Sequence, residues 1–309
     1  MAYLMVTQAS GRKKGYTATL MNTVVDSLSQ VDGIEVEVFH LHDYKFGPCK
    51  SCFSCIRNVG SGCVLKDDWG QSGEGILYQA FLRANGLLMF DPVHGWGMSA
   101  MSRVFLERVY PTFWIGTPYG MPFGSVSCAS NQGFQFKAVQ EFCKKAAGNG
   151  FQYLGGLPVH TAYFEKALAQ AVELGMKVAD AALADEDNGR SKLTDNEIFD
   201  MYRETPWSLL DGYLENLTNG SFTYEGSVPE TALREGTFTK SDAHELLVHT
   251  CNHLEAALKL HRDGNRRDAA KECALAAKFW TNATFKQFAS SIVNADIPAA
   301  YRPLDELNK

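Results

Sequence analysis

The stretch that decides the fold is Gly86-Leu-Leu-Met-Phe-Asp-Pro-Val-His-Gly-Trp-Gly97. Residues 87–90 are all apolar, a pattern typical of a central parallel strand that is covered on both faces. A loop with one proline and two glycines follows, and Ser99 is placed to cap the next helix. Because ligands bind at the carboxyl ends of the strands in an open parallel sheet, this loop is a candidate binding loop.

Strand and helix patterns alternate on both sides of this stretch. The strand patterns are short and apolar or alternate with period two, whereas the helical patterns repeat apolar positions every three or four residues. Five strands alternating with helices predict a doubly wound α/β domain with a parallel sheet. The strand patterns cover residues 3–8, 34–41, 86–90, 123–129 and 151–155, and the helical patterns cover 17–28, 99–109, 135–147 and 162–184.

A polar run at residues 185–190 indicates the end of this domain, and strand patterns nearly vanish beyond it. The remaining sequence has helix-start signals and long amphipathic patterns, with a looser stretch at residues 224–237. We therefore predict an α/β domain at residues 1–187 and an α-helical C-terminal extension at 188–309. The helix-start signals lie at residues 194–197 and at Thr205 with Pro206, and the long helical patterns cover 241–262 and 267–287.

The composition limits the classes of function. With 309 residues, 45% apolar and 21% charged, the chain can bury a sizeable core and is neither disordered nor collagen-like. The formal net charge of −6 argues against nucleic acid as a partner. No apolar run is long enough to span a membrane or to form a signal-peptide core. We expect a soluble cytoplasmic protein.

The turn between the first predicted strand and helix is rich in polar groups. It reads Ala9-Ser-Gly-Arg-Lys-Lys-Gly-Tyr-Thr17, with two glycines, hydroxyl groups and a basic run. A helix N-terminus presents unpaired N–H groups and the positive end of a dipole, which suit a phosphate dianion. The alternative is an ordinary strand-to-helix loop with a solvated basic patch, because the segment matches no standard phosphate-binding motif.

Four of the eight cysteines fall within fifteen residues. Cys49, Cys52, Cys55 and Cys63 form a C-x2-C-x2-C-x7-C pattern. In a reducing compartment, such a cluster indicates metal or redox chemistry before disulfides, and C-x2-C-x2-C spacing is used by [4Fe–4S] sites. Tetrahedral zinc, a redox-active thiol pair and a loop that binds nothing are the alternatives.

A second metal hypothesis concerns the predicted helix at residues 241–262. Glu245, His249 and His253 are spaced four apart, which allows side chains to share a metal ion. However, the apolar stripe of this helix leaves Glu245 and His249 off its centre, so we expect no metal site. Cys251 and Cys273 are expected to pack as small apolar groups.

Four motifs together carry a family resemblance. They are Ala-Ser-Gly-Arg-Lys-Lys-Gly-Tyr-Thr-Ala at residues 9–18, Gly-Pro-Cys-Lys-Ser-Cys-Phe-Ser-Cys at 47–55, Cys-Val-Leu-Lys-Asp-Asp at 63–68, and Asp-Pro-Val-His at 91–94 with Met-Ser-Ala at 98–100. In this order they resemble the NADPH-dependent FMN reductase family and, within it, the iron–sulfur flavoproteins. The likeness covers residues 1–185 and implies a flavodoxin-like fold with a cysteine-rich insertion at 47–68.

The resemblance also implies a set of site residues. FMN would be the cofactor, and the four cysteines would hold a [4Fe–4S] cluster. Tyr16 and His94 depart from the usual family residues, and no side chain is assigned as a catalytic acid or base. The implied phosphate ligands are Ser10, Arg12, Tyr16 and Thr17, the residues against the ring are Pro92, Val93, His94, Gly95 and Trp96, and those at its far edge are Cys128, Ala129, Ser130 and Asn131.

These features predict an FMN-dependent oxidoreductase. Electrons would come from NAD(P)H or a ferredoxin-type protein and pass to a quinone, another small molecule or a protein. One alternative is a flavodoxin-like electron-transfer protein without its own substrate. Another is that the extension binds a partner or builds an oligomer, with a structural or regulatory FMN. By analogy with the family, we expect a homodimer or homotetramer.

Overall fold

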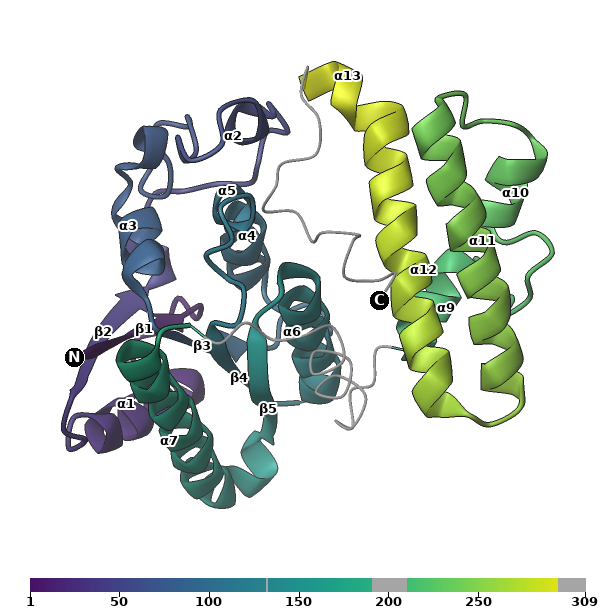
Figure 1. Cartoon of the computed structure of the whole chain (residues 1–309). Coiled ribbons are helices and arrows are strands. Elements are labelled where there is room, and N and C mark those ends of the chain that lie inside the picture. Colours follow the sequence, from purple (N-terminus) through teal and green to yellow (C-terminus); the bar gives the residue numbers. More distant parts are fainter. Residues whose placement is uncertain (132, 191–209, 294–309) are drawn as a thin grey trace. The chain divides into compact units, whose positions relative to one another are not determined.

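The computed structural model describes residues 1–131, 133–190 and 210–293. The chain forms two compact units, Met1–Thr194 and Asp195–Lys309. The first is an α/β unit and the second is helical over its described residues (Figure 1). No helix in the described ranges is long and apolar enough to cross a bilayer.

The predicted five-stranded parallel sheet is confirmed, with the strand order β2-β1-β3-β4-β5. β3 lies at its centre and is buried at every residue, as the continuous apolar run predicts. β2 is an edge strand whose residues alternate between exposed and half-buried positions before its buried Phe39. The strands are β1 (Ala2–Gln8), β2 (Ile34–His40), β3 (Gly86–Pro92), β4 (Pro122–Ala129) and β5 (Gln152–His160).

Helices cover both faces of the sheet (Figure 1). On one face, α1 (Tyr16–Leu28) and α7 (Phe164–Asn188) pack on an aliphatic core formed with β1, β3 and β4. On the other, α3 (Ile76–Arg83), α4 (Ala100–Arg108) and α6 (Gln135–Asn149) contribute aromatic side chains. There, the Phe81 and Phe105 rings are 6.4 Å apart and those of Phe123 and Phe142 are 6.2 Å apart, measured between ring centroids.

The ends of two elements in this unit differ from the sequence prediction, and one helix is additional. β5 continues to His160 instead of ending at Gly155, because an edge strand tolerates Pro158 without losing a central ladder bond. α7 continues to Asn188 instead of ending near residue 184, because Asp185 is buried and paired with Arg190 at 3.3 Å. The short helix α3 was not predicted. The other short elements are η1 (Leu41–Asp43), α2 (Ser54–Arg57), η2 (Gln71–Gly73), α5 (Tyr110–Phe113) and η3 (Thr161–Tyr163).

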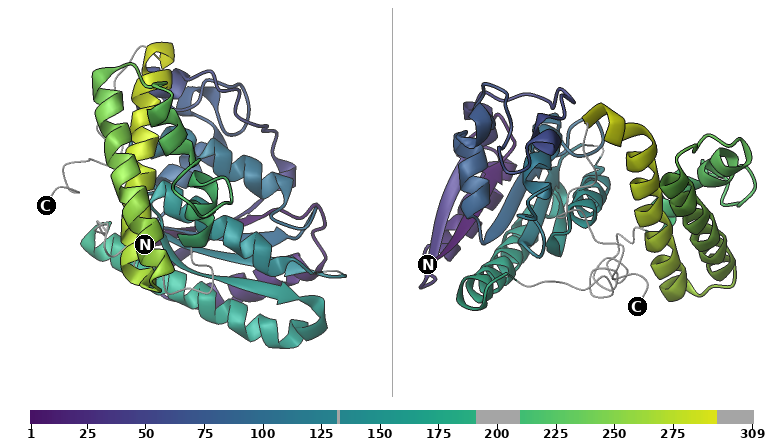
Figure 2. Two further views of the ribbon diagram at one scale, coloured as in Figure 1. Left: turned by 90° about the vertical axis from the view of Figure 1, so that its right-hand side faces the viewer. Right: turned by 45° about the horizontal axis from the view of Figure 1, so that its top comes forward.

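The second unit is built around two long helices, α11 (Ser241–Arg262) and α12 (Arg266–Thr284), which lie side by side (Figure 2). The predicted helix at 267–287 changes after Thr284 into the π-helical turn η4 (Phe285–Ala289), which α13 (Ser290–Val293) follows. Cys251 and Cys273 are buried in the cores of this unit, as expected for small apolar groups.

Two shorter helices precede this pair. α9 (Leu210–Leu217) lies downstream of the helix start expected at Thr205 with Pro206, and α10 (Val228–Arg234) lies in the stretch expected to be loose. α10 forms because Ser227 accepts a hydrogen bond from Glu230 N while the Glu230 carboxylate accepts one from Gly226 N, which is a local capping arrangement. The predicted helix starts at 194–197 and at Thr205 with Pro206 lie outside the described residues.

Candidate functional site

The carboxyl ends of β1, β3 and β4 lie next to one another. Gln8 is paired with Phe90 in the sheet register, and Pro92 is paired with Cys128. Backbone hydrogen bonds continue this pairing into the loops, from Ala9 N to Phe90 O and from Val93 N to Cys128 O, both at 2.9 Å. The loops that follow these three strands therefore start side by side, as the parallel topology predicts.

The loop after β1 leads into the N-terminus of α1. The helix begins after Gly15, which offers no side chain as a cap. Ser10 and Thr17 are buried here, whereas Arg12 and Tyr16 are exposed. Arg12 Nε lies 3.9 Å from the position that a Cβ on Gly15 would occupy, so the guanidinium is beside the first turn. Hydroxyls, a cation and an uncapped helix N-terminus fit a phosphate dianion.

Side chains from neighbouring segments hold this loop in place. The Gln8 amide donates to Arg12 O at 3.2 Å, and the His40 ring contacts the Gln8 amide oxygen at 3.2 Å. The His42 ring contacts Ala9 O at 3.1 Å. Sequence reasoning missed these three residues, since polar side chains at strand ends carry no pattern that assigns them a partner. The Tyr16 ring packs edge-on against Phe164, with centroids 4.8 Å apart.

The loop after β3 contains a tight turn. His94 and Gly97 exchange backbone hydrogen bonds of 3.2 and 3.3 Å across Gly95 and Trp96, which both have positive φ, 56° and 63°. Positive φ at both central positions is the requirement of a type I′ turn, and it is uncommon for a bulky residue such as tryptophan. Pro92 is buried and Val93 half-buried, whereas residues 94–96 are exposed.

Asp91 anchors the start of this loop, a role that the sequence did not reveal. Its fully buried carboxylate accepts hydrogen bonds from Ser99 Oγ at 2.5 Å, Ser102 Oγ at 2.7 Å and Ser99 N. Burial raises the pKa of Asp91 to about 7, against the opposing effect of the Ser102 and Ser99 hydrogen bonds. The carboxyl group thereby ties the end of β3 to the first turn of α4.

Glu141 on α6 anchors the other end of the loop. Its Oε2 accepts a 2.7 Å hydrogen bond from Met98 N and a 2.6 Å hydrogen bond from the Arg103 guanidinium. Arg103 also donates to Met98 O at 3.1 Å. The loop from 92 to 98 is therefore fixed at both ends by carboxylates from different elements, which suits it to hold a rigid ligand.

The end of β4 forms the remaining wall of this edge. Cys128 and Ala129 are buried, whereas Ser130 and Asn131 are exposed. Burial raises the pKa of the Cys128 thiol to about 11, so this sulfur stays protonated at neutral pH. The Asn131 carbonyl lies 3.3 Å from His160 Nε2, which connects this segment to the end of β5.

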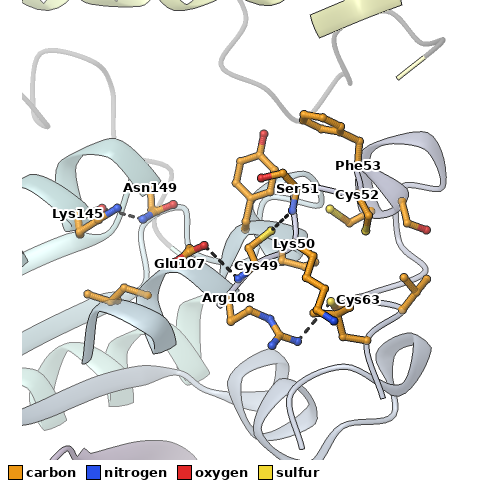
Figure 3. A pocket seen from close by; sticks show the side chains of 17 residues that line it. Cys49, Lys50, Ser51, Cys52, Phe53, Cys63, Glu107, Arg108, Lys145 and Asn149 are labelled. Carbon is orange, nitrogen blue, oxygen red and sulfur yellow. Dashed lines mark hydrogen bonds between the residues drawn. The ribbon is translucent and has the colours of Figure 1, made fainter. Parts of the chain in front are cut away.

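The four clustered cysteines line one pocket of about 320 Å³ (Figure 3). Its other walls come from the last turns of α4, residues 106–108, and of α6, with Lys145 and Asn149. Ser51 and Phe53 have positive φ, 48° and 56°, so the chain reverses sharply between the first three cysteines. Burial raises the pKa of Cys55 to about 11, and the other three thiols add to this effect.

Arg108 on α4 is the central hydrogen-bond donor beside this pocket. The side chain is 1% exposed and forms a two-pronged ion pair with Asp67, at 2.7 and 2.9 Å. It also donates to Gly47 O at 2.7 Å. A further hydrogen bond runs from Arg108 to Cys63 Sγ at 3.4 Å (Figure 3). Burial acts to raise the pKa of Asp67, but the Arg108 hydrogen bonds and charge outweigh it and lower this pKa.

The geometry of the thiols differs from that of a preformed metal site. Among the described residues, no three Cys, His, Asp or Glu side chains are grouped to hold a metal ion. The donor set is nevertheless suited to an iron–sulfur cluster, since four thiols share one pocket with a guanidinium donor. Ser51 N also donates to Cys49 Sγ at 3.4 Å. The chemistry of this donor set therefore fits an iron–sulfur cluster.

Two histidines of α11 pack against one aromatic ring. Phe279 stacks with both His249 and His253, with ring centroids 5.0 and 5.3 Å apart. His253 Nδ1 also lies 2.7 Å from Glu272. Both histidines therefore have aromatic packing partners within the second unit.

The strand order and the loop at the end of β1 define the flavodoxin-like class of α/β proteins. A family model of the NADPH-dependent FMN reductases matches residues 3–178, more than half of the chain. The chain therefore belongs to this family of flavodoxin-like FMN-dependent oxidoreductases, as the sequence motifs indicate.

Individual relatives match over shorter segments. An iron-sulfur flavoprotein of Archaeoglobus fulgidus is 30% identical over 76 residues, which is 25% of this chain and 35% of the relative. Another from Methanocaldococcus jannaschii is 28% identical over 102 residues, 33% of this chain and 49% of the relative. The chain thus spans less than half the length of these curated relatives. Among solved structures, the chain is similar to RosB with a bound formylriboflavin phosphate. The two sequences are 13% identical, the TM-score is 0.46, and the match covers 61% of this chain and 82% of RosB.

Proposed function

We propose that this protein is an FMN-dependent oxidoreductase that takes electrons from NAD(P)H or a ferredoxin-type protein. It passes them to a quinone, another small molecule or a protein. The observation that carries this proposal is the convergence of three loops at the carboxyl ends of β1, β3 and β4 in a member of an FMN reductase family. One loop suits a phosphate, and the other two form a rigid wall for a ring.

Each loop has a separate task in this proposal. The first turn of α1, with Ser10, Arg12 and Thr17, binds the phosphate, and Tyr16 contributes its backbone N–H. Residues 92–96 and 128–131 contact the ring and exclude water from it. Asp91 and Glu141 orient the loop that carries residues 92–96. Bound FMN supplies one- and two-electron chemistry, so hydride transfer requires no side-chain acid or base.

The first experiment tests the cofactor and the donor together. Purified protein should be yellow, contain one FMN per chain, and oxidise NADH or NADPH with ferricyanide as the electron acceptor. A colourless protein that does not take up FMN would refute the proposal. Flavin that is reduced by ferredoxin or dithionite, but by neither pyridine nucleotide, would favour the electron-carrier alternative.

We further propose that Cys49, Cys52, Cys55 and Cys63 are the ligands of a [4Fe–4S] cluster. Support comes from their shared pocket, the Arg108 donor to Cys63 and the names of the two curated relatives. Anaerobically purified protein should contain about four iron atoms per chain, as a [4Fe–4S] cluster requires. Zinc instead of iron, or no metal after anaerobic reconstitution, would contradict this assignment.

We also propose that the protein assembles as a homodimer or homotetramer, as the family analogy suggests. Light scattering of the full chain measures this directly. The expected mass is two or four times the 34.1 kDa of one chain, and a monomer at micromolar concentration would contradict the proposal.

A further inference from the structure

The last turn of α4 contacts both ends of the cysteine segment (Figure 3). The Glu107 carboxylate accepts a 3.1 Å hydrogen bond from Cys49 N, so the first cysteine is held through its backbone. The next residue of the helix, Arg108, donates to the sulfur of Cys63, the last of the four cysteines, at 3.4 Å. Two adjacent helical residues therefore hold the first and the last thiol-bearing positions against one rigid element.

The Arg108 side chain offers more donors than its ion pair with Asp67 uses. Both terminal nitrogens donate to Asp67, and one of them, Nη2, also donates to Cys63 Sγ. The side chain is 1% exposed, and its third nitrogen, Nε, is buried with no hydrogen-bond partner among the described residues. A buried N–H group without a partner is destabilising. The guanidinium therefore has donor capacity that the protein alone does not use, beside a pocket that it lines.

Asp67 fixes the orientation of this guanidinium. Its carboxylate accepts from both terminal nitrogens, and its Oδ1 also accepts from Trp69 N at 3.2 Å and from Gly70 N at 2.8 Å. A planar guanidinium bound in this two-pronged way keeps its donors in fixed directions. The donor to Cys63 is thus held in place by the protein itself.

We propose that Arg108 is a positioning residue for the cluster bound by the four cysteines and that its hydrogen bond to Cys63 Sγ raises the reduction potential of that cluster. This inference rests on the proposed [4Fe–4S] assignment and adds a residue that sets a property of the same site. Hydrogen bonds to the sulfurs are one of the factors that set the potential of an iron–sulfur cluster. Reduction adds negative charge that the sulfur ligands share, so a cationic donor stabilises the reduced state more than the oxidised state.

Burial distinguishes Arg108 from the other cations of this pocket. Lys50 and Lys145 also line the pocket, but both side chains are exposed. Water and salt screen exposed charges, whereas a buried donor is screened much less. A guanidinium also stays protonated at every pH at which the protein is folded, so its effect does not depend on titration.

An EPR-monitored redox titration of the anaerobically purified full chain measures the midpoint potential of the cluster in wild type and three variants. Arg108→Met combined with Asp67→Asn removes the donor to Cys63 and leaves no unpaired buried charge, so this double variant is expected to fold. Arg108→Lys keeps the charge but loses the two-pronged geometry, and it decides the question if the double variant fails to fold. Lys145→Gln is the matched control, because it removes an exposed cation from the same pocket.

The equilibrium constant for one-electron reduction of the cluster should fall about tenfold in the double variant, the effect of one charge-assisted hydrogen bond. This change is a shift of about 59 mV to lower potential. Arg108→Lys should shift the potential in the same direction by a smaller amount. The equilibrium constant of Lys145→Gln should stay within about twofold of the wild-type value.

Equal midpoint potentials in wild type, the double variant and Arg108→Lys would overturn the inference and leave the cluster assignment intact. A fall in Lys145→Gln as large as that in the double variant would also overturn it, because charge in the pocket would then set the potential without the hydrogen bond. Wild-type protein that holds no iron after anaerobic reconstitution would refute the cluster assignment, and this inference with it.

Discussion

Asp91 offers the sharpest test of how the ring-side loop is held. Its carboxyl group is fully buried, accepts hydrogen bonds from Ser99 and Ser102, and has a pKa raised to about 7 by burial. The substitution Asp91→Asn keeps the shape of the side chain and one acceptor oxygen while removing its titration. Comparing the two proteins across pH therefore isolates the free energy of ionising this one group.

The direction in which the free energy of unfolding changes with pH follows from the protonation of Asp91 in the folded and unfolded states. In the unfolded chain, the group titrates near its ordinary value of 3.8, whereas the folded protein keeps the proton up to about pH 7. Between these values the folded state binds more protons, so the free energy of unfolding falls as pH rises. At about 1.4 kcal/mol for each pH unit between these two pKa values, the loss amounts to about 4 kcal/mol and is complete above pH 7.

Urea unfolding, followed by circular dichroism at several pH values from 4.5 to 8.5, measures this effect. The difference in unfolding free energy between Asp91→Asn and wild type should grow by about 3 kcal/mol from pH 4.5 to pH 7.5. Ser102→Ala removes a hydrogen-bond donor to the carboxylate, so the pKa of Asp91 should rise further in this variant. Its free energy of unfolding should therefore continue to fall at a higher pH than in the wild type. A difference that stays constant within 1 kcal/mol would refute the reasoning.

Three further predictions concern the first loop, the buried ion pair and the contact of α1 with α7. Arg12→Ala should weaken FMN binding about tenfold in a flavin-fluorescence titration, and unchanged affinity would remove Arg12 from the phosphate site. Asp67→Asn should lower the free energy of unfolding by about 3 kcal/mol because Arg108 stays charged and buried without its partner. The ion pair stabilises the wild-type protein fully above pH 3.8, and this stabilisation is lost as pH falls through the lowered pKa of Asp67. Unfolding measured at decreasing pH should therefore show a shrinking difference between the variant and the wild type. Gly175→Ala should cost about 1 to 2 kcal/mol in thermal unfolding because its Cβ would lie 2.5 Å from Val24, and a loss that persists in a Val24→Ala background would contradict this cause.

Local patterns predicted the sheet because parallel strands leave a strong signal. Residues 87–90 have the continuous apolar run of a strand buried on both faces, and the observed β3 lies at the centre of the sheet. The misplaced end of α7 had a different cause. Its last turn is polar, and it stays helical because Asp185 is buried against Arg190, a tertiary contact that composition does not reveal.

In the candidate site, too, the sequence predicts the position of the loops but not the side chains that hold them. The topology brings the loops after β1, β3 and β4 to one edge, so a reader of the sequence can locate them. The side chains that fix these loops were not predictable, because their partners lie far away in the sequence. Glu141 holds Met98 across 43 residues, and Arg108 holds Asp67 across 41. Asp91 lies inside a recognised motif, but nothing local distinguishes a buried carboxyl group from an exposed one.

Helix α4 is anchored at both of its ends. Ser99 and Ser102 attach its first turn to Asp91, and Arg108 attaches its last turn to Asp67. A single-turn slip of this rod would displace it by about 5.4 Å and break both anchors together. The loop after β3 and the cysteine pocket are therefore attached to the same helix. A variant made at either end of α4 is informative only when the site at the other end is assayed as well.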